Sequence, residues 1–249
     1  MGALDVRTRL QHFAIVTFAV DPAALRRHVH PRFDIETVID RDGRSRALVS
    51  VVPFRDVDFA FISMPWPRWS FGQTNYRAYI IDSVTGQRAV WFFGTSLDFV
   101  GVVIPRHLWR LPWHKATIAF DCEYDEGRRL YRSYRMTTAS RWAPAHLEIE
   151  DTGIAPTEFS GFTDLEVGLV TLTHPLDGYY HRSDARLGTY RVAHARLRPT
   201  VGRVIAARFP LLDRLGLVAT GDTSGIHSVL LQPETEFTIQ LPPSLCAAV

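Results

Sequence analysis

Short runs of β-branched and aromatic residues, separated by turn residues, place the strongest restriction on the fold of this chain. The first run covers residues 10–20, and two pairs of runs read as hairpins, 34–40 with 46–54 and 74–82 with 88–97. Further strand-like runs follow at residues 115–122, 130–138, 186–197, 227–232 and 236–241. Because hairpins join antiparallel strands, the sequence predicts an α+β fold that is mainly antiparallel β, a barrel or sandwich with a few peripheral helices.

Two helix starts are recognisable. Asp21-Pro22 offers a capping side chain followed by a proline in the first turn, and it precedes a predicted short helix at residues 23–29. Thr163 and Glu166 have the spacing of a capping box, which predicts a helix that reaches Leu172.

The same rules give expectations for three other segments. Residues 99–109 and 204–215 are predicted to be helical, the second interrupted by Pro210. Residues 64–69 contain two prolines, which a central strand does not accept, so we expect a surface or pocket-lining loop there.

Length and composition indicate one domain that covers residues 1–249, because no repeat, low-complexity tract or long linker divides the chain. The two cysteines, Cys122 and Cys246, form neither a disulfide framework nor a zinc pattern. The first residues lack the apolar core of a signal peptide, and no apolar run approaches the ~20 residues that span a bilayer. We therefore expect a cytoplasmic protein without a membrane partner.

The charge distribution argues against nucleic acid as a partner. The formal net charge is only +2, and arginines alternate with acidic residues along the chain. Of the 28 basic residues, one is a lysine, Lys115, and the rest are arginines. A GC-rich genome explains most of this bias. The remaining lysine is nevertheless of interest, because an ammonium group can lose its proton and act as a nucleophile, whereas a guanidinium cannot.

Several short segments, in chain order, resemble one known superfamily. They are residues 15–35 (IVTFAVDPAALRRHVHPRFDI), 52–54 (VPF), 75–79 (NYRAY), 91–93 (WFF), 96–98 (SLD) and 187–197 (LGTYRVAHARL). Together they resemble the acetoacetate decarboxylase-like superfamily, and most closely its uncharacterised YqjF-like branch. The similarity extends over residues 10–241 and implies the fold of that superfamily, with no cofactor.

The resemblance also implies a catalytic position. In acetoacetate decarboxylases, a lysine that follows a proline forms a Schiff base with the substrate ketone, and a second lysine beside it lowers its pKa. In this chain Trp113 and His114 follow Pro112, so both family lysines are absent in strict register. Lys115 lies two residues beyond Trp113 and would share its face of a strand, which makes Lys115 the candidate catalytic residue. Alternatively, Lys115 is a surface cation or a non-covalent binding cation.

The candidate substrate-binding residues lie in three segments. Asn75 and Arg77 share one face of a predicted strand and are suited to holding a carboxylate, although an ion pair inside the sheet would place an arginine there equally well. Trp113 and His114 occupy the family's catalytic segment. His194 alternates with Arg196 on another strand and is a candidate pocket residue, or a histidine satisfied within the core. No metal site is predicted.

Two functions from different classes follow from these observations. The first is a Schiff-base lyase, a decarboxylase or an aldolase-dehydratase, acting on a small keto acid. The second is a non-catalytic protein that binds a small carbonyl or carboxylate compound in the same fold. A homo-oligomer is a further prediction, with the apolar residues 100–104 as a subunit contact.

Overall fold

The fold is that of a computed structural model, which describes residues 2, 4–99, 101 and 107–246. Three helices lie within this part of the chain: α1 (Pro22–Arg26), α3 (Leu165–Thr173) and α4 (Pro210–Arg214). The strands are β1 (Val6–Val20), β2 (Phe33–Ile35), β3 (Thr37–Ile39), β4 (Ser45–Phe61), β5 (Met64–Asp82), β6 (Arg88–Leu97), β7 (Trp113–Lys115), β8 (Thr117–Asp125), β9 (Leu130–Ala139), β10 (Ala145–Asp151), β11 (Asp177–His181), β12 (Leu187–His194), β13 (Thr200–Arg208) and β14 (Ile226–Leu245).

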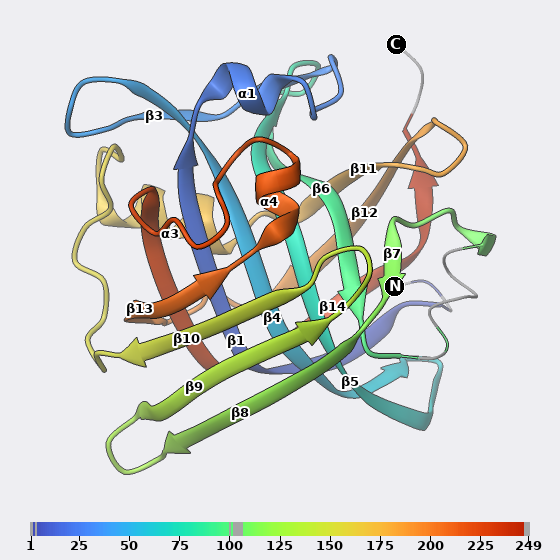
Figure 1. Ribbon diagram of the computed structural model, residues 1–249. Helices are drawn as coiled ribbons and strands as arrows, with labels where there is room; N and C mark the ends of the chain where they lie inside the picture. The colour runs from blue at the N-terminus through green and yellow to red at the C-terminus, as the bar shows by residue number, and fades with distance from the viewer. Residues whose placement is uncertain (1, 3, 100, 102–106, 247–249) are drawn as a thin grey trace.

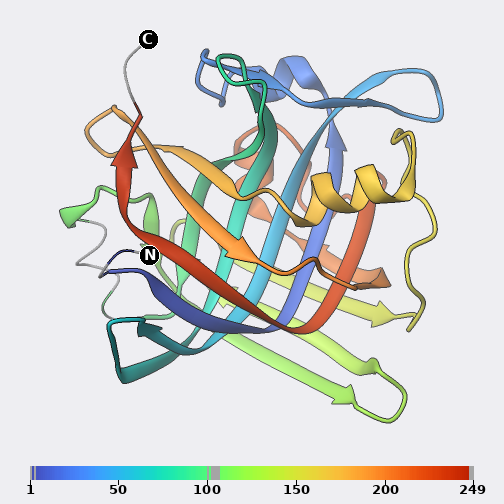
Figure 2. The ribbon, with the colours of Figure 1, turned by 180° about the vertical axis from the view of Figure 1, so that it is seen from behind.

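Seven of the described strands pair in a closed ring. The order is β1-β4-β5-β6-β11-β12-β14, and β14 pairs again with β1 (Figures 1 and 2). All neighbours in this ring are antiparallel except β6 and β11, which are parallel. The predicted hairpin of residues 74–82 with 88–97 is confirmed, since Gln73 pairs with Leu97 and Ile81 with Arg88. The mainly antiparallel β fold is therefore confirmed as well.

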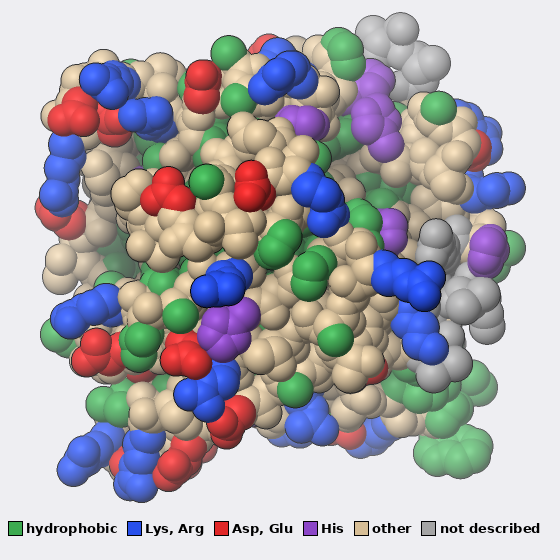
Figure 3. Space-filling view, in the orientation of Figure 1, with side chains coloured by type: hydrophobic (Ala, Val, Ile, Leu, Met, Phe, Trp, Pro, Cys, Tyr) green, Lys and Arg blue, Asp and Glu red, His purple; other side chains and the backbone are tan. Residues whose placement is uncertain are grey.

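A second layer of strands covers one side of the ring. β13 pairs with β14 and continues through β10, β9 and β8, and these four strands cross in front of β1, β4 and β5 (Figure 1). The layers approach closely at Gly72, where a Cβ atom would lie 2.7 Å from the Cβ atom of Ile118. On the solvent face of this layer, basic and acidic side chains interleave, as in the pairs Arg132–Asp125 and Arg135–Glu148 (Figure 3).

The two layers produce two apolar cores, and β1 contributes to both by alternation. Its residues Ala14, Val16 and Phe18 belong to the core between the ring and the second layer. Phe13 and Ile15 belong to the core inside the ring. This division follows from the period of two along a strand, which sends neighbouring side chains to opposite faces.

The helices begin at capping residues, although one differs from the predicted residue. The side chain of Asp21 accepts a hydrogen bond from the backbone N–H of Ala23 and caps α1, as predicted. Helix α3 is capped by Asp164, which accepts from the N–H of Val167, so the predicted capping box of Thr163 and Glu166 is wrong. An aspartate is as good a cap as a threonine, and the spacing alone does not decide between adjacent residues.

Two predicted segments have a different structure. Residues 64–69 are not a loop but the first part of β5, where the strand pairs with β4. Among the described strands none pairs with the other side of β5 over residues 64–69, so β5 is an edge at that point and tolerates proline. Residues 204–208 belong to β13 and pair with β10, and only the part from Pro210 onward is helical.

Two predicted features fall largely on residues that the structure does not describe. Much of the predicted helix 99–109, and most of the predicted subunit contact 100–104, lies outside the described residues. None of the helices that the structure describes is long and apolar enough to span a membrane.

Candidate functional site

One face of β5 carries a row of side chains that changes in chemistry along the strand. Trp69, Phe71, Gln73, Asn75 and Arg77 follow one another at every second position, so they share this face. With a rise of about 3.3 Å per residue, the row extends over about 26 Å. All five side chains line cavities inside the ring, and we call them the β5 row.

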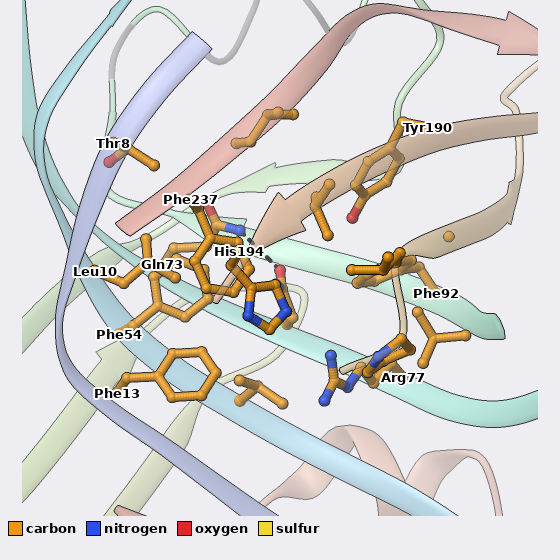
Figure 4. Close-up of a pocket in the computed structure, with 18 of the residues that line it drawn as sticks. Thr8, Leu10, Phe13, Phe54, Gln73, Arg77, Phe92, Tyr190, His194 and Phe237 are labelled. Atoms are coloured by element: carbon orange, nitrogen blue, oxygen red, sulfur yellow. Dashed lines mark hydrogen bonds between the residues drawn. The ribbon is translucent and has the colours of Figure 1, made fainter. Parts of the chain in front are cut away.

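The polar end of the β5 row lines a cavity of about 80 Å³, which we call the Arg77 pocket. Its walls are mostly apolar. Figure 4 shows Arg77 and His194 pointing into this pocket from different strands. The lining residues include Thr8, Leu10, Phe13, Val52, Phe54, Asp56, Gln73, Asn75, Arg77, Phe92, Tyr190, His194 and Phe237.

The guanidinium of Arg77 is the principal charge in the Arg77 pocket. The residue is only 9% exposed, and its Nη2 donates a hydrogen bond of 3.0 Å to the carbonyl oxygen of Leu172 in α3. Its Nε is buried without a hydrogen-bond partner, and no carboxylate within the described part of the chain pairs with it. A buried cation without a counter-ion is costly, so this environment favours an anion in the pocket.

The amide of Asn75 is oriented by two neighbours. Its Oδ1 accepts a hydrogen bond of 2.9 Å from Gln73 Nε2 and one of 2.8 Å from Thr95 Oγ1. Thr95 is the cross-strand partner of Asn75 on β6. Because the oxygen is used in this way, the NH₂ group of Asn75 is the part that remains for a ligand.

His194 supplies an uncharged acceptor. Its Nδ1 lies 2.7 Å from the carbonyl oxygen of Ala195, which requires a proton on Nδ1 and leaves the lone pair on Nε2. Burial lowers the pKa of His194 to about 4, and the nearby His174 and Arg77 contribute in the same direction. The imidazole is therefore neutral near pH 7. His174 lies beside it, with ring centroids 4.5 Å apart.

Asp56 is a carboxyl group in the lining of the Arg77 pocket. It is 1% exposed and accepts a hydrogen bond of 2.9 Å from the hydroxyl of Thr8, while its Oδ2 is buried without a partner. Burial raises its pKa to about 7. The pocket lining therefore includes a permanent cation, Arg77, and a titratable carboxyl group, Asp56, beside a second carboxylate, Asp177, which pairs with Arg191.

The apolar end of the β5 row lines a second and larger cavity, of about 240 Å³, which we call the aromatic chamber. It adjoins the Arg77 pocket, because Gln73, Tyr190 and Ile239 line both. The other lining residues are Phe59, Phe61, Trp69, Phe71, Leu97, Phe99, Gly101, Trp109, Leu111, Trp113, Leu241 and Pro243.

The structure brings together three of the six candidate residues from the sequence. Arg77, Asn75 and His194 line the Arg77 pocket, and Trp113 lines the adjoining aromatic chamber. His114 and Lys115 instead line an open surface hollow of about 550 Å³ between β7 and the end of β9. Lys115 is exposed, and His114 stacks on Trp142 with ring centroids 4.0 Å apart.

Lys115 and Trp113 therefore do not share a cavity, contrary to the expectation from strand alternation. β7 has only three residues and, among the described strands, pairs with β6 alone, so its period of two is not maintained by a long ladder. The catalytic role of Lys115 stays a prediction, and the structure does not bring this residue into the Arg77 pocket.

Sequence reasoning missed Asp56, His174 and the aromatic half of the β5 row. A signal for the row was present, since the pattern Trp-x-Phe-x-Gln-x-Asn-x-Arg has a period of two over residues 69–77. The two prolines before Trp69 predict a loop, so the pattern is not recognised as one continuous strand that includes Trp69. Nothing local distinguishes Asp56 from the neighbouring Asp58, which is exposed and forms an ion pair with Arg9.

No group of three or more potential metal ligands gathers in the described part of the chain.

The ring of seven strands around a small interior pocket is the fold of acetoacetate decarboxylase-like proteins, whose solved structures are similar to this one. Residues 7–236 match the family DUF2071, described as "Uncharacterized conserved protein". The chain belongs to this family, which agrees with the YqjF-like resemblance. It matches none of the curated proteins.

Solved structures with the same fold include three that illustrate its range. The enduracididine biosynthesis enzyme MppR complexed with pyruvate superposes with a TM-score of 0.61 at 12% identity, over 98% of this chain and 91% of MppR. The acetoacetate decarboxylase of Legionella pneumophila gives 0.59 at 11% identity, over 97% and 87%. An acetoacetate decarboxylase-like enzyme from Sphingomonas wittichii gives 0.61 at 9%, over 100% and 95%. At these identities the similarity establishes the fold.

Proposed function

We propose that this protein binds a small organic carboxylate reversibly in the Arg77 pocket. The observation that carries the proposal is the buried guanidinium of Arg77, which is 9% exposed and has no carboxylate partner within the described residues. A bound carboxylate offsets the cost of that buried charge and matches the planar, forked donors of arginine. Among the described residues no carboxylate pairs with Arg77, which favours a bound ligand over the alternative explanation, an ion pair within the sheet.

The class of ligand that fits best is a 2-oxo acid. Its carboxylate would lie on Arg77, and its carbonyl oxygen would accept a hydrogen bond from the NH₂ group of Asn75. The neutral His194 offers its Nε2 to a hydroxyl group, if the ligand is hydrated or reduced. The complex of MppR with pyruvate supports this choice, because pyruvate is a 2-oxo acid held by a protein of the same fold.

Imine chemistry receives less support. The chain has a single lysine, Lys115, which is exposed and lines the surface hollow rather than the Arg77 pocket. A Schiff-base lysine needs a dry environment that favours the neutral amine. We therefore favour non-covalent binding over the Schiff-base lyase. A cytoplasmic location, a homo-oligomeric state and independence of cofactors stay predictions.

The proposal is tested by calorimetric titration with pyruvate and acetoacetate. Wild-type protein is expected to bind at least one of them, and Arg77→Met to weaken that affinity at least about 30-fold, because removing one member of a buried charge pair costs about 2–5 kcal/mol. Arg203→Met is the matched control, since Arg203 is 74% exposed on β13 and outside the pocket. Equal affinity of the wild type and Arg77→Met would contradict the proposal.

A further inference from the structure

The aromatic chamber is lined mainly by apolar side chains. Its walls include Trp113 and four rings that contact one another in pairs, Phe59 with Phe71, Trp69 with Phe99, and Phe71 with Phe99 at a centroid distance of 5.0 Å. Among its described lining residues, Gln73 has the only amide side chain, and no lining residue is charged. An apolar cavity of this kind holds water poorly and accepts apolar molecules readily.

The chamber and the Arg77 pocket adjoin each other. Gln73, Tyr190 and Ile239 line both cavities, and the β5 row runs from the aromatic rings of Trp69 and Phe71 to the cation of Arg77 without changing face. A three-carbon acid held at Arg77 would leave the chamber empty. A longer chain attached to the same head group would extend toward Gln73 and enter the chamber.

The charged groups that line the two cavities are confined to the Arg77 pocket, which is lined by Arg77, by the buried carboxyl group of Asp56 and by Asp177, which pairs with Arg191. The only cation among the described lining residues of the two cavities is Arg77, and it lies at the end away from the chamber. Together the two volumes reach the lower end of the range of pockets for small-molecule ligands, about 300 Å³. A molecule with one anionic end and one apolar end would match the cation of Arg77 and the apolar walls of the chamber.

We infer that the ligand is an amphipathic carboxylate, a 2-oxo acid with a medium-length alkyl or aryl tail, whose head lies on Arg77 and whose tail fills the aromatic chamber. This inference rests on the proposed function, because it takes the carboxylate site at Arg77 as the anchor. It adds the chemistry of the tail, which the Arg77 pocket by itself does not define. Each methylene that enters the chamber is expected to tighten binding about fourfold, from a transfer free energy of about 0.8 kcal/mol.

The test compares three probes on the wild-type protein: pyruvate, 2-oxooctanoate and the uncharged 2-octanone. We expect 2-oxooctanoate to bind at least about tenfold more tightly than pyruvate, allowing for methylenes that remain outside the chamber. We expect 2-octanone to bind much more weakly than 2-oxooctanoate, because it lacks the carboxylate. This comparison requires no variant to fold.

A matched pair of variants locates the tail. Trp69→Gln replaces a half-buried wall of the chamber and is expected to remove most of the preference for 2-oxooctanoate over pyruvate. Trp66→Gln is the control, since Trp66 lies on the same strand, is 79% exposed and lines neither cavity. If both variants lose the preference for 2-oxooctanoate to the same extent, or if neither loses it, the inference is overturned.

The failures of the two proposals are distinguishable. If pyruvate and 2-oxooctanoate bind equally and both depend on Arg77, the carboxylate site stands and the amphipathic ligand is overturned. If 2-octanone binds as tightly as 2-oxooctanoate, or if no probe binds, the anchor at Arg77 is wrong and both proposals are overturned.

Discussion

The imidazole of His194 stacks on the ring of Phe237, with centroids 4.1 Å apart and planes inclined by 11°. The two residues are direct cross-strand partners, His194 on β12 and Phe237 on β14. The stacking covers one face of the imidazole with an apolar ring, and the hydrogen bond from Nδ1 to the carbonyl oxygen of Ala195 fixes the orientation of the imidazole. His194 is therefore held as a neutral group at the wall of the Arg77 pocket.

The stability of the protein should depend on this histidine in weakly acidic solution. Burial lowers the folded-state pKa of His194 to about 4, whereas the ordinary pKa of a histidine is 6.5. Protonation therefore favours the unfolded chain, and the contribution of His194 is complete above pH 6.5 and is lost as the pH falls toward 4. Between pH 7 and 5, wild type should lose up to about 2 kcal/mol more than His194→Gln. Urea denaturation at both pH values measures this difference, and parallel losses in the two proteins would contradict it.

Asp56 should have the opposite pH dependence. Burial raises its folded-state pKa from 3.8 to about 7, so the folded state retains a proton that the unfolded chain releases. Stability from this group is complete below pH 3.8 and is lost as the pH rises to 7. Asp56→Asn keeps an acceptor for Thr8 and removes the titration. Relative to wild type, its stability should rise by on the order of 3 kcal/mol between pH 4 and pH 8.

The control for this prediction is a carboxyl group on the same strand. Asp58 is exposed and paired with Arg9, so Asp58→Asn should change little with pH. Urea denaturation of the three proteins at pH 4 and pH 8 provides the measurement. For each variant, the difference from wild type in the free energy of unfolding is compared between pH 4 and pH 8. If this difference changes equally for Asp56→Asn and Asp58→Asn, the burial of Asp56 has no electrostatic consequence.

Lys115 should not form an imine with a ligand of the Arg77 pocket. It is exposed at the surface hollow, and it lies outside both interior cavities. Incubation with pyruvate and sodium borohydride, followed by intact mass measurement, should therefore give no reduced adduct. Lys115→Arg should bind pyruvate as the wild type does. An adduct mapped to Lys115 would restore the Schiff-base lyase and displace the binding proposal.

Gly72 should be required for the contact between the ring and the second layer. Its position is on the face of β5 opposite to the β5 row, where an added Cβ would lie 2.7 Å from the Cβ and 2.9 Å from the Cγ2 of Ile118. Gly72→Ala is expected to destabilise the protein by about 1–3 kcal/mol through overpacking. Gly225→Ala is the control, because the nearest atom to its Cβ is at 3.4 Å. Thermal denaturation of both variants decides whether the two layers approach as closely as described.

The sequence alone determined the strands and their local pairing. β-branched and aromatic runs around clear turns gave the hairpin of β5 and β6, and the period of two placed Asn75 and Arg77 on one face. These features are local, since a strand and its turn are encoded by neighbouring residues. The prolines of residues 64–69 misled the prediction because their acceptability depends on whether a second strand lies alongside.

Only the tertiary structure decided which faces became the interior. The pairings of β14 with β1 and of β6 with β11 close the ring. This closure brings His194 and Arg77 into one pocket, although 116 residues lie between them in the sequence. The same closure buried Asp56 while Lys115 stayed on the surface. A period of two states that alternate residues share a face, but non-local pairing determines whether that face meets water or a cavity.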